Sequence, residues 1–267
     1  MEKNYWQIND DVYKVHISAD VFDELKEDFK VSDMAKYMKD GNIYAYDIMV
    51  KKDKLQEVLE RLDKHNIELH FRMLVSAPSG SGKTSFVYNL LHIMDNTFDK
   101  IYVITANKDE PLYNHLEEKS KGRIIITEGI SSIPDMDDFK KEEQYLVIFD
   151  DLVNKKNQTP IINYFIRCRK KNCSAIYITQ SYYDVPTIIR KNVNYAVFLK
   201  LGGVKELKMI MRDYSMDDIN QLKNMFEYAT NDKFQVLIID KESQDPQRKF
   251  RKNYLDYLNP ADFVSPK

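Results

Sequence analysis

The segment Ala77-Pro78-Ser79-Gly80-Ser81-Gly82-Lys83-Thr84 constrains the fold of this chain more than any other. A largely apolar run, residues 71–75, stops at this segment, and apolar residues at helical spacing follow it over residues 86–94. A strand, a loop of small residues and a helix in this order place a nest of backbone N–H groups at the start of the helix, where phosphate oxygens bind. The pattern predicts a nucleoside triphosphate site. The alternative is a Ser/Gly loop that precedes an ordinary helix.

Each position of the loop has an expected role. Lys83 would reach the β- and γ-phosphates, and the hydroxyl of Thr84 would ligate Mg²⁺. The residues expected to bind the nucleotide are Ser79, Gly80, Ser81, Gly82, Lys83, Thr84 and Ser85. The strict pattern has glycine where this chain has Ala77, at a position that mainly shapes the entry to the loop.

Two carboxylates follow a second apolar strand. The run Tyr145–Phe149 ends in Asp150 and Asp151, and Asp150 lies 67 residues after Lys83. In a buried parallel strand, side chains at the carboxyl end project into the crevice where ligands bind. We expect Asp150 to hold Mg²⁺, usually through water, and Asp151 to polarise the attacking water. The alternative is that the pair caps the next helix.

A third apolar strand ends in a polar residue. Residues 175–178 precede Thr179, Gln180 and Ser181. If this strand lies beside the one that ends in Asp150, Gln180 can donate a hydrogen bond to the γ-phosphate or to the lytic water. Gln180 is therefore predicted to sense hydrolysis. The alternative is a polar residue that marks the end of the strand.

Composition limits the class of protein. The 267 residues are 43% hydrophobic and 31% charged, which suits one large α/β domain with a small appendage. No apolar run is long enough for a membrane span, and the first residues lack the apolar stretch of a signal peptide. We therefore expect a cytoplasmic protein that is not secreted. Cys168 and Cys173 are expected to lie in one basic helical stretch, on different faces, and to be free thiols. The net charge of −2 predicts that a polyanion would bind through local basic patches.

Three regions follow from the pattern of elements. Residues 1–68 are predicted to form a small N-terminal α+β appendage, with strands at 12–17 and 43–50 and helices near 22–29 and 54–65. Residues 69–240 alternate strands and helices, which predicts a parallel sheet covered by helices. Among these elements we expect a helix near 111–119, a helix over 216–230 capped by Ser215, and a last strand over 234–240. Residues 241–267 are polar, and we expect an extended tail. Its basic run, 248–252, is interpreted as a solvated charge run or, less favoured, as a nucleic-acid contact.

Four ordered blocks within residues 70–240 resemble the FtsK–HerA superfamily of ring ATPases, and most closely the genome-packaging ATPases of large DNA viruses, poxviruses and virophages. The blocks are the phosphate loop 77–84, the strand 146–151, the basic stretch 167–172 and the segment 178–186 with its continuation to Asn192. The first two blocks alone would indicate only a nucleoside triphosphatase. The last block is the most specific, because general phosphate-loop proteins lack it.

The resemblance implies a role for an arginine. In that superfamily the arginine before the sensor strand reaches the ATP site of the neighbouring subunit, and Arg169, eleven residues before Gln180, matches its position. An arginine supplied in this way stabilises charge on the transferring phosphoryl group. Arg167 and Arg190 are the competing candidates, and a cation at a helix C-terminus is the structural alternative. Many relatives have glutamate where this chain has Asp151, so the water would lie closer or another residue would help.

The resulting prediction is an α/β fold of the RecA-like P-loop NTPase class, a mostly parallel sheet flanked by helices with the small N-terminal appendage. The resemblance implies an ATPase, with ATP and Mg²⁺ as cofactors, that assembles into a homo-oligomeric ring (pentamer or hexamer) and moves double-stranded DNA without sequence preference. It further implies capsid or other virion proteins as partners and a location in the host cytoplasm or viral factory. Lys200 and Lys205 are candidates for DNA contact.

Two other functions fit the same residues. The first is a small-molecule kinase of the same broad fold, which would need an acceptor pocket and an arginine-rich lid. The second is a nucleotide-binding assembly or scaffold protein with weak turnover, which Ala77 and Asp151 leave open.

Overall fold

The computed structural model describes residues 5–18, 22, 33–39, 42–55, 67–94, 97–108, 111–120, 122–153, 157–200, 203–216, 218–243 and 245–264. The chain divides into two compact units, Met1–Asn66 and Ile67–Lys267. The boundary lies two residues before the one predicted from the sequence. Within the described residues, no helix is both long enough and apolar enough to cross a membrane.

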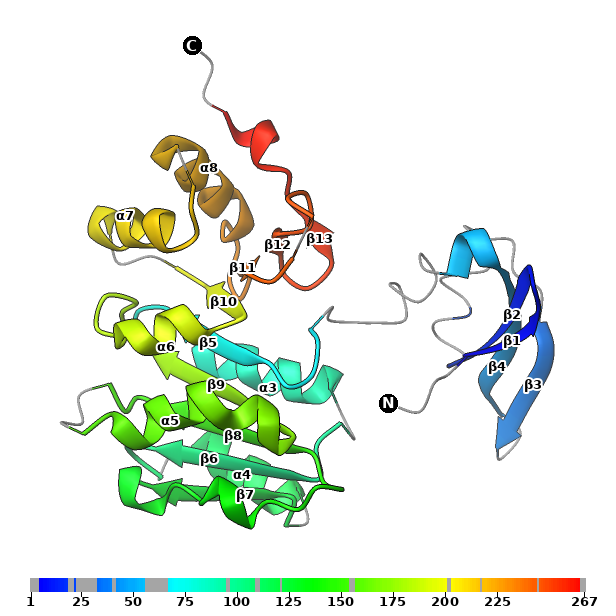
Figure 1. Ribbon diagram of the computed structural model, residues 1–267, viewed down its shortest axis with the longest axis horizontal. Coiled ribbons are helices and arrows are strands. Elements are labelled where there is room, and N and C mark those ends of the chain that lie inside the picture. The colour runs from blue at the N-terminus through cyan, green and yellow to red at the C-terminus, as the bar shows by residue number, and fades with distance from the viewer. Residues whose placement is uncertain are drawn as a thin grey trace. The chain divides into compact units, whose positions relative to one another are not determined.

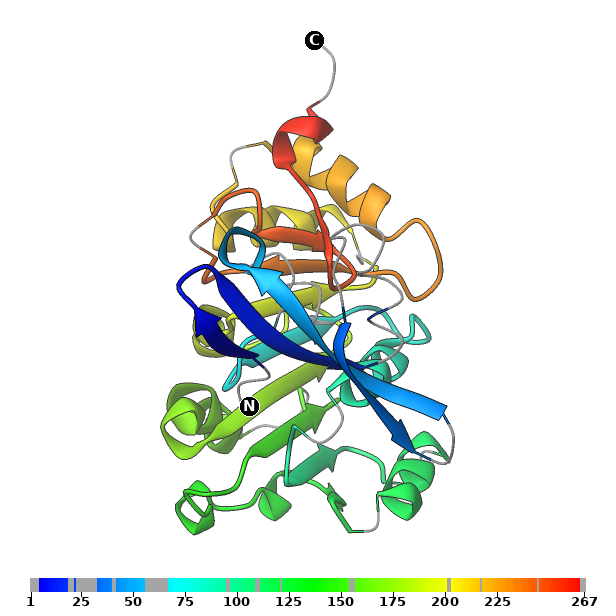
Figure 2. The same cartoon turned by 90° about the vertical axis from the view of Figure 1, so that its right-hand side faces the viewer.

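The first unit contains a four-stranded antiparallel sheet in the order β1-β2-β4-β3, coloured blue in Figure 2. Its strands are β1 (Tyr5–Asn9), β2 (Val12–Ser18), β3 (Asp33–Lys39) and β4 (Asn42–Lys51). The strands expected at 12–17 and 43–50 are confirmed, whereas β1 and β3 were not predicted. Most of the residues of the two helices expected near 22–29 and 54–65 lie outside the described part of the chain.

The second unit is built on a nine-stranded sheet in the order β13-β12-β11-β10-β5-β9-β8-β6-β7 (Figure 1). The six strands from β10 to β7 in this order are mutually parallel, and β11, β12 and β13 add to the β10 edge in antiparallel orientation. The parallel strands are β5 (Arg72–Ser76), β6 (Lys100–Thr105), β7 (Ile124–Glu128), β8 (Tyr145–Asp150), β9 (Cys173–Thr179) and β10 (Tyr195–Phe198). The predicted mostly parallel sheet is confirmed.

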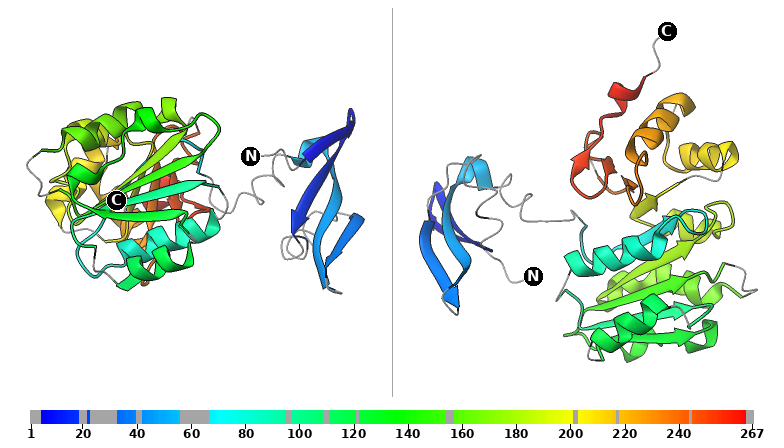
Figure 3. Two further views of the ribbon diagram at one scale, coloured as in Figure 1. Left: turned by 90° about the horizontal axis from the view of Figure 1, so that it is seen from below. Right: turned by 180° about the vertical axis from the view of Figure 1, so that it is seen from behind.

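Helices cover both faces of this sheet, as the left view of Figure 3 shows. One face packs on α3 (Lys83–Ile93) and α4 (Pro111–Lys119), and the other on α5 (Thr159–Arg167), α6 (Thr187–Asn192), α7 (Val204–Asp213) and α8 (Ile219–Ala229). Side chains of a strand alternate between its faces, so in β8 Leu146 and Ile148 belong to the first core and Val147 and Phe149 to the second. Burial on both faces explains why the strands read as continuous apolar runs.

Short helical turns fill the connections. They are η1 (Ile130–Ser132) and η2 (Met136–Asp138) in the charged segment before β8, η3 (Cys168–Lys171) between α5 and β9, and η4 (Pro260–Phe263) near the C-terminus. Cys168 lies in η3 and Cys173 opens β9, and both are buried free thiols. The expectation that one basic helical stretch holds both cysteines is therefore wrong, although the thiols are free as expected.

The region after Asp240 is not an extended tail. Strands β11 (Leu237–Asp240), β12 (Phe250–Lys252) and β13 (Asp256–Tyr257) form an antiparallel extension of the sheet. Arg251 is only 1% exposed and lies 3.7 Å from Asp240, and Lys249 Nζ donates to the carbonyl of Tyr214 at 2.8 Å. The basic run is thus tied to the protein itself, because these cations find acceptors in β11 and after α7.

One helix start also differs from the prediction. We expected Ser215 to cap a helix from Met216, but α8 begins at Ile219 and its cap is Asp218, whose carboxylate accepts from the N–H groups of Asn220 and Gln221. A carboxylate is the better cap here because it also complements the positive end of the helix dipole.

Candidate nucleotide site

The phosphate loop connects β5 to α3 at the carboxyl edge of the sheet. Gly80 and Gly82 have φ values of +74° and +92°, a region that residues with a Cβ rarely occupy. A Cβ on Gly80 would meet open space, so the backbone conformation alone requires glycine there. At Gly82 a Cβ would also lie 2.6 Å from the ring of Phe234. The glycines of the motif thus have a conformation that favours glycine over other residues.

Ala77 fits the loop without strain. It is 1% exposed and packs in the core beneath α3, and its N–H donates to the carbonyl of Thr179 at 3.2 Å. Its φ is not positive, so Ala77 does not need the conformation that favours glycine. The missing first glycine therefore costs little, because the chain is still in strand-like conformation at this point.

Lys83 opens α3 and its side chain turns back over the loop. The Nζ atom donates to the carbonyls of Ala77 at 2.7 Å and Pro78 at 3.0 Å. These bonds hold the ammonium group inside the curve of the loop, next to the backbone N–H groups of the nest. The side chain is therefore positioned to contact phosphate oxygens.

The two carboxylates come from the carboxyl end of β8. Because β8 pairs with β9 and β9 with β5, the ends of these three strands lie together, with Asp150 opposite Ile178 and Ser76 opposite Thr179. Asp150 is 7% exposed and accepts a hydrogen bond from the hydroxyl of Tyr113 in α4. Asp151 is partly exposed and has φ +52°, an uncommon conformation that marks a constrained position.

Gln180 contacts Asp151 directly. Its Nε2 atom donates to both carboxylate oxygens of Asp151, at 3.3 and 3.2 Å. The sequence had predicted only that Gln180 would face phosphate or water. The short aspartate is thus oriented by the amide at the end of the neighbouring strand.

Two linked side-chain hydrogen bonds hold the turn after Asp151. Tyr177 donates its hydroxyl proton to Gln158 at 3.2 Å, and Gln158 Nε2 donates to the carbonyl of Leu152 at 2.6 Å. Burial, together with the nearby carboxylate of Asp151, raises the pKa of Tyr177, so its hydroxyl stays protonated and remains a donor. The carboxylate pair therefore lies on a well-supported turn.

A cavity of about 370 Å³ collects these groups at one site. It is lined by Ser79, Gly80, Gly82, Lys83, Thr84, Ser85, Asp150, Asp151, Ile178, Thr179, Gln180 and Phe234. Of the residues predicted to bind the nucleotide, Ser81 faces a second hollow of about 810 Å³, which adjoins the first through Gly80 and Phe234. Lys83, Thr84, Asp150, Asp151 and Gln180 thus converge as predicted.

The donor set of this cavity suits magnesium. The hydroxyl of Thr84 and the carboxylate of Asp150 are hard oxygen donors, the type that Mg²⁺ prefers, and Mg²⁺ usually takes one or two protein ligands with substrate phosphates completing its shell. Within the described residues, no group of three or more His, Cys, Asp or Glu side chains could hold a metal ion.

Two residues of the site were missed from the sequence. Tyr113 is 3% exposed and bonds to Asp150, and Phe234, 64% exposed with φ +67°, lies against the loop at Gly82. Tyr113 lies in the predicted helix 111–119, but no spacing rule relates it to Asp150. Phe234 was expected to begin the last strand, and only its tertiary position places it at the cavity.

Arg169 lies at the other end of the sheet. It is in η3, before the amino end of β9, whereas Gln180 follows the carboxyl end, and the seven residues of β9 separate the two by about 20 Å. Its side chain is 56% exposed and pairs with Glu242 at 3.6 Å. Arg169 therefore does not reach the cavity of its own chain.

The two competing arginines differ in their surroundings. Arg167 is half exposed at the same edge and pairs with Asp137 at 3.3 Å. Arg190 is buried, forms an ion pair with Asp213, donates to the carbonyl of Val185 and lies 5.3 Å from the centre of the Tyr182 ring. Arg190 is thus a packing residue, and part of the family-specific block 178–192 is explained by packing.

A family described as "Poxvirus A32 protein" matches residues 59–250. The chain belongs to the poxvirus A32 protein family. The match extends over the phosphate loop, the carboxylate strand and β9, and it ends inside β12.

Several relatives in sequence are named as DNA packaging proteins. The DNA packaging protein OPG160 of vaccinia virus (strain Copenhagen) is 26% identical over 192 residues, which is 65% of this chain and 71% of that protein. The protein of the same name from variola virus is 24% identical over 197 residues, or 67% of this chain and 73% of that protein.

Solved structures confirm the fold. The genome packaging NTPase B204 of Sulfolobus turreted icosahedral virus 2, in complex with AMPPCP, superposes with a TM-score of 0.54 at 16% identity, covering 69% of this chain and 97% of that one. The complex of the same NTPase with ATP-gammaS superposes with a TM-score of 0.54 at 15% identity, covering 70% of this chain and 98% of that one. At this identity the likeness shows a shared fold, that of a P-loop NTPase, as the sequence predicted.

Proposed function

We propose that this chain is the ATPase of a viral genome-packaging motor. The observation that carries the proposal is the single cavity where Lys83, Asp150, Asp151 and Gln180 meet at the phosphate loop. Family membership supports the packaging role, because the relatives are named as DNA packaging proteins. The substrate is ATP, whose triphosphate would lie along the loop 79–85, with its nucleoside end near the exposed ring of Phe234.

Thr84 and Asp150 would hold Mg²⁺. The ion, when bound, supplies positive charge to the phosphate oxygens and so lowers the energy of the transition state. Tyr113 keeps the carboxylate of Asp150 in one orientation. A buried, hydrogen-bonded carboxylate needs no rearrangement before it acts as a ligand.

Hydrolysis would depend on Asp151 and Gln180. Asp151 orients the attacking water and accepts the proton that the water loses, and Gln180 holds Asp151 in place through two hydrogen bonds. When the γ-phosphate leaves, the amide of Gln180 loses a neighbour, which makes it suited to report the phosphate state. Lys83 neutralises charge on the phosphates during transfer.

Arg169 would complete the site of an adjacent copy. The side chain is exposed at the edge of the sheet opposite its own phosphate loop, so a head-to-tail ring of five or six subunits would bring it to a neighbour's triphosphate. An arginine provided in this way raises the rate by roughly 10³ to 10⁵. Turnover would then depend on assembly.

The cargo is double-stranded DNA. A packaging motor must move any sequence, so it would bind the phosphate backbone through cations without reading bases. Lys200 and Lys205 are exposed and remain candidates for this contact. Capsid or other virion proteins would anchor the ring, and the work would take place in the host cytoplasm or viral factory.

The decisive experiment measures ATP hydrolysis across protein concentration, with and without linear duplex DNA. We expect the specific activity to rise with concentration, to be stimulated by DNA, and to lose that stimulation between about 50 and 200 mM salt, because counterion release weakens backbone binding. Lys83→Ala should abolish turnover, and Arg169→Ala should lower kcat on the order of 10³-fold.

Arg167→Ala is the matched control, since it removes an arginine from the same edge and leaves Arg169 in place. It should retain turnover within about twofold. A specific activity that is independent of concentration and unaffected by Arg169→Ala would contradict the motor. Phosphorylation of an added small-molecule acceptor would point to a kinase instead.

A further inference from the structure

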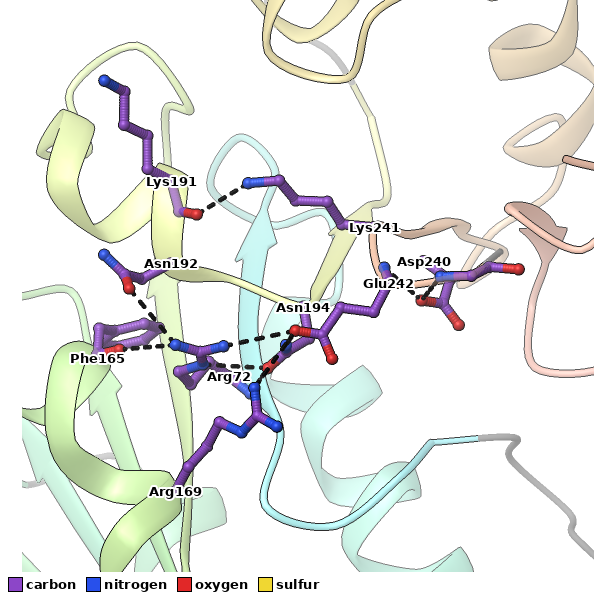
Figure 4. Close-up of polar contacts among 10 residues, drawn as sticks. Arg72, Phe165, Arg169, Lys191, Asn192, Asn194, Asp240, Lys241 and Glu242 are labelled. Carbon is purple, nitrogen blue, oxygen red and sulfur yellow. Dashed lines mark hydrogen bonds and ion pairs between the residues drawn. The ribbon is translucent and has the colours of Figure 1, made fainter. Parts of the chain in front are cut away.

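Arg169 does not project alone from the edge of the sheet. Its Nη1 atom lies 3.6 Å from Oε1 of Glu242, in the turn that follows β11, and Figure 4 shows the two side chains meeting beside the start of β5. Glu242 is separated from Arg169 by more than 70 residues of chain, so only the tertiary structure brings them together.

The same oxygen of Glu242 is held from the protein interior. Asn194, which is 4% exposed, donates its side-chain N–H to Oε1, and Nη2 of Arg72 lies 3.6 Å from it. Asn194 in turn accepts from the backbone N–H of Arg72 at 2.9 Å and from its Nε at 3.1 Å. Oε1 therefore has a fixed position, set by residues at the start of β5 and β10.

The backbone of Glu242 is fixed as well. Its N–H donates to the carboxylate of Asp240 at 3.1 Å, and the N–H of Lys241 donates to the carbonyl of Asn194 at 2.8 Å. Figure 4 shows the contact between Glu242 and Asp240 on the side of the turn away from Arg169. Both the backbone and the carboxylate of Glu242 are therefore held in place. The guanidinium of Arg169, which pairs with this carboxylate, then has one preferred orientation.

The cationic side chains around Glu242, those of Arg72, Arg169 and Lys241, form a cluster that attracts anions. Arg72 and Arg169 share one carboxylate, and Lys241 extends toward Lys191, whose carbonyl accepts from its Nζ at 2.8 Å. The cluster therefore keeps a net positive charge beside Glu242, and a phosphate that approached Arg169 would be attracted.

The neighbouring arginine lacks such support. Arg167 pairs with Asp137, whose side chain is 58% exposed and which is shared with Lys171 at 2.7 Å in the η2–η3 region. Lys171 and Arg167 lower the pKa of Asp137. Among the described side chains, no link of this kind from Asp137 to the sheet is seen.

We propose that Glu242 is a positioning residue for Arg169: it holds the guanidinium outward, in the orientation needed to meet the triphosphate of an adjacent copy. This inference rests on the proposed role of Arg169. A long side chain loses rotamer freedom when it is fixed. Because Glu242 already restricts Arg169 in the free subunit, less freedom remains to be lost when the neighbouring site forms. Asn194 acts on Arg169 through Glu242, whereas Arg72, a like charge, also interacts with Arg169 directly.

The test compares Glu242→Gln with the matched control Asp137→Asn. Glutamine retains an oxygen that can accept from Asn194 but removes the charge that holds Arg169. We expect Glu242→Gln to lower kcat about tenfold to a hundredfold, with the KM for ATP and the assembly state measured by light scattering unchanged. Asp137→Asn, which releases Arg167 instead, should leave kcat unchanged. Glu242→Asp should recover part of the loss, because the charge is restored on a shorter side chain.

A mixing experiment separates a positioning role from local damage. Lys83→Ala subunits cannot turn over ATP but carry an intact Arg169–Glu242 pair, so adding them to Glu242→Gln subunits should raise turnover per Glu242→Gln subunit. No recovery would mean that Glu242 supports its own site, and would overturn the proposal.

Two other outcomes distinguish this inference from the proposed function. If Arg169→Ala is inactive while Glu242→Gln has the wild-type kcat, the positioning role is wrong and the motor stands. If Arg169→Ala itself keeps the wild-type kcat, the trans role fails, and the role of Glu242 fails with it.

Discussion

Asp150 and Asp151 stand next to each other in the chain but are held in different ways. Asp150 is buried and accepts a hydrogen bond from the hydroxyl of Tyr113, whereas Asp151 is partly exposed and accepts hydrogen bonds from the amide of Gln180. The two environments suit two tasks, a metal ligand that must stay in place and a carboxylate that must contact water. Adjacent residues can divide the chemistry because β8 ends at Asp150 and the chain turns at Asp151, whose φ is +52°.

The hydrogen bond from Tyr113 gives a prediction at this scale. Tyr113→Phe should raise the Mg²⁺ concentration for half-maximal ATP hydrolysis about tenfold, because a metal ligand loses the group that orients it. The variant should also lose about 1–2 kcal/mol of unfolding free energy, since a buried carboxylate loses a donor.

Tyr164→Phe is the control for that substitution. Tyr164 is a buried tyrosine whose hydroxyl donates to the carbonyl of Pro134, on the face of the sheet away from Tyr113. It should lower stability but leave the Mg²⁺ dependence unchanged. An equal Mg²⁺ shift in both variants would show that the effect comes from general loosening of the domain.

The short helix α6 depends on one ion pair. Arg190, with 6% of its side chain exposed, pairs with Asp213 at the end of α7, and the hydroxyl of Tyr182 donates to the same carboxylate at 3.0 Å. Six residues are too few for a helix to be stable alone, so tertiary contacts must hold α6. The family-specific block 178–192 therefore includes residues that join β9, α6 and α7 structurally. We call the contacts of Arg190 and Tyr182 with Asp213 the α6–α7 joint.

Asp213→Ala tests this joint at the scale of elements. It should lower the unfolding free energy by about 3 kcal/mol, measured by urea denaturation, because it leaves the guanidinium of Arg190 buried without its carboxylate. Asp137→Ala, which breaks an exposed ion pair, should cost less than about 1 kcal/mol. Equal losses in the two variants would contradict a structural role for the buried pair.

The whole molecule consists of two units with separate interiors. The larger unit has one apolar core on each face of its sheet, and the described buried apolar residues of the smaller unit, Val15, Ile48 and Val50, belong to neither. The family match covers residues 59–250, so it falls almost entirely within the larger unit. The nucleotide cavity and the Arg169 edge both lie in that unit.

Deletion of residues 1–66 is the prediction at this scale. The fragment 67–267 should unfold cooperatively, with a denaturant midpoint equal to that of the main transition of the full chain, because its cores are complete without the first unit. Circular dichroism during guanidinium titration measures this. A fragment that unfolds without a cooperative transition would show that the first unit supplies part of the core.

Local patterns determined much of this protein. Glycine at positive φ, a lysine at a helix start and apolar strands that end in polar residues act over a few residues. Local spacing therefore predicted the phosphate loop, the parallel sheet and most, but not all, of the residues that line the cavity. The helix Pro111–Lys119 was predicted with its observed bounds for the same reason.

Only the tertiary structure decided which distant groups meet. The pairing of β8, β9 and β5 brings Gln180 to Asp151, and the antiparallel return of β11 and β12 brings Glu242 to Arg169 and buries Arg251. In the same way, Tyr113 reaches Asp150 and Phe234 reaches the cavity. Such contacts depend on pairing and packing between segments far apart in the chain, and no short-range pattern of residues encodes them.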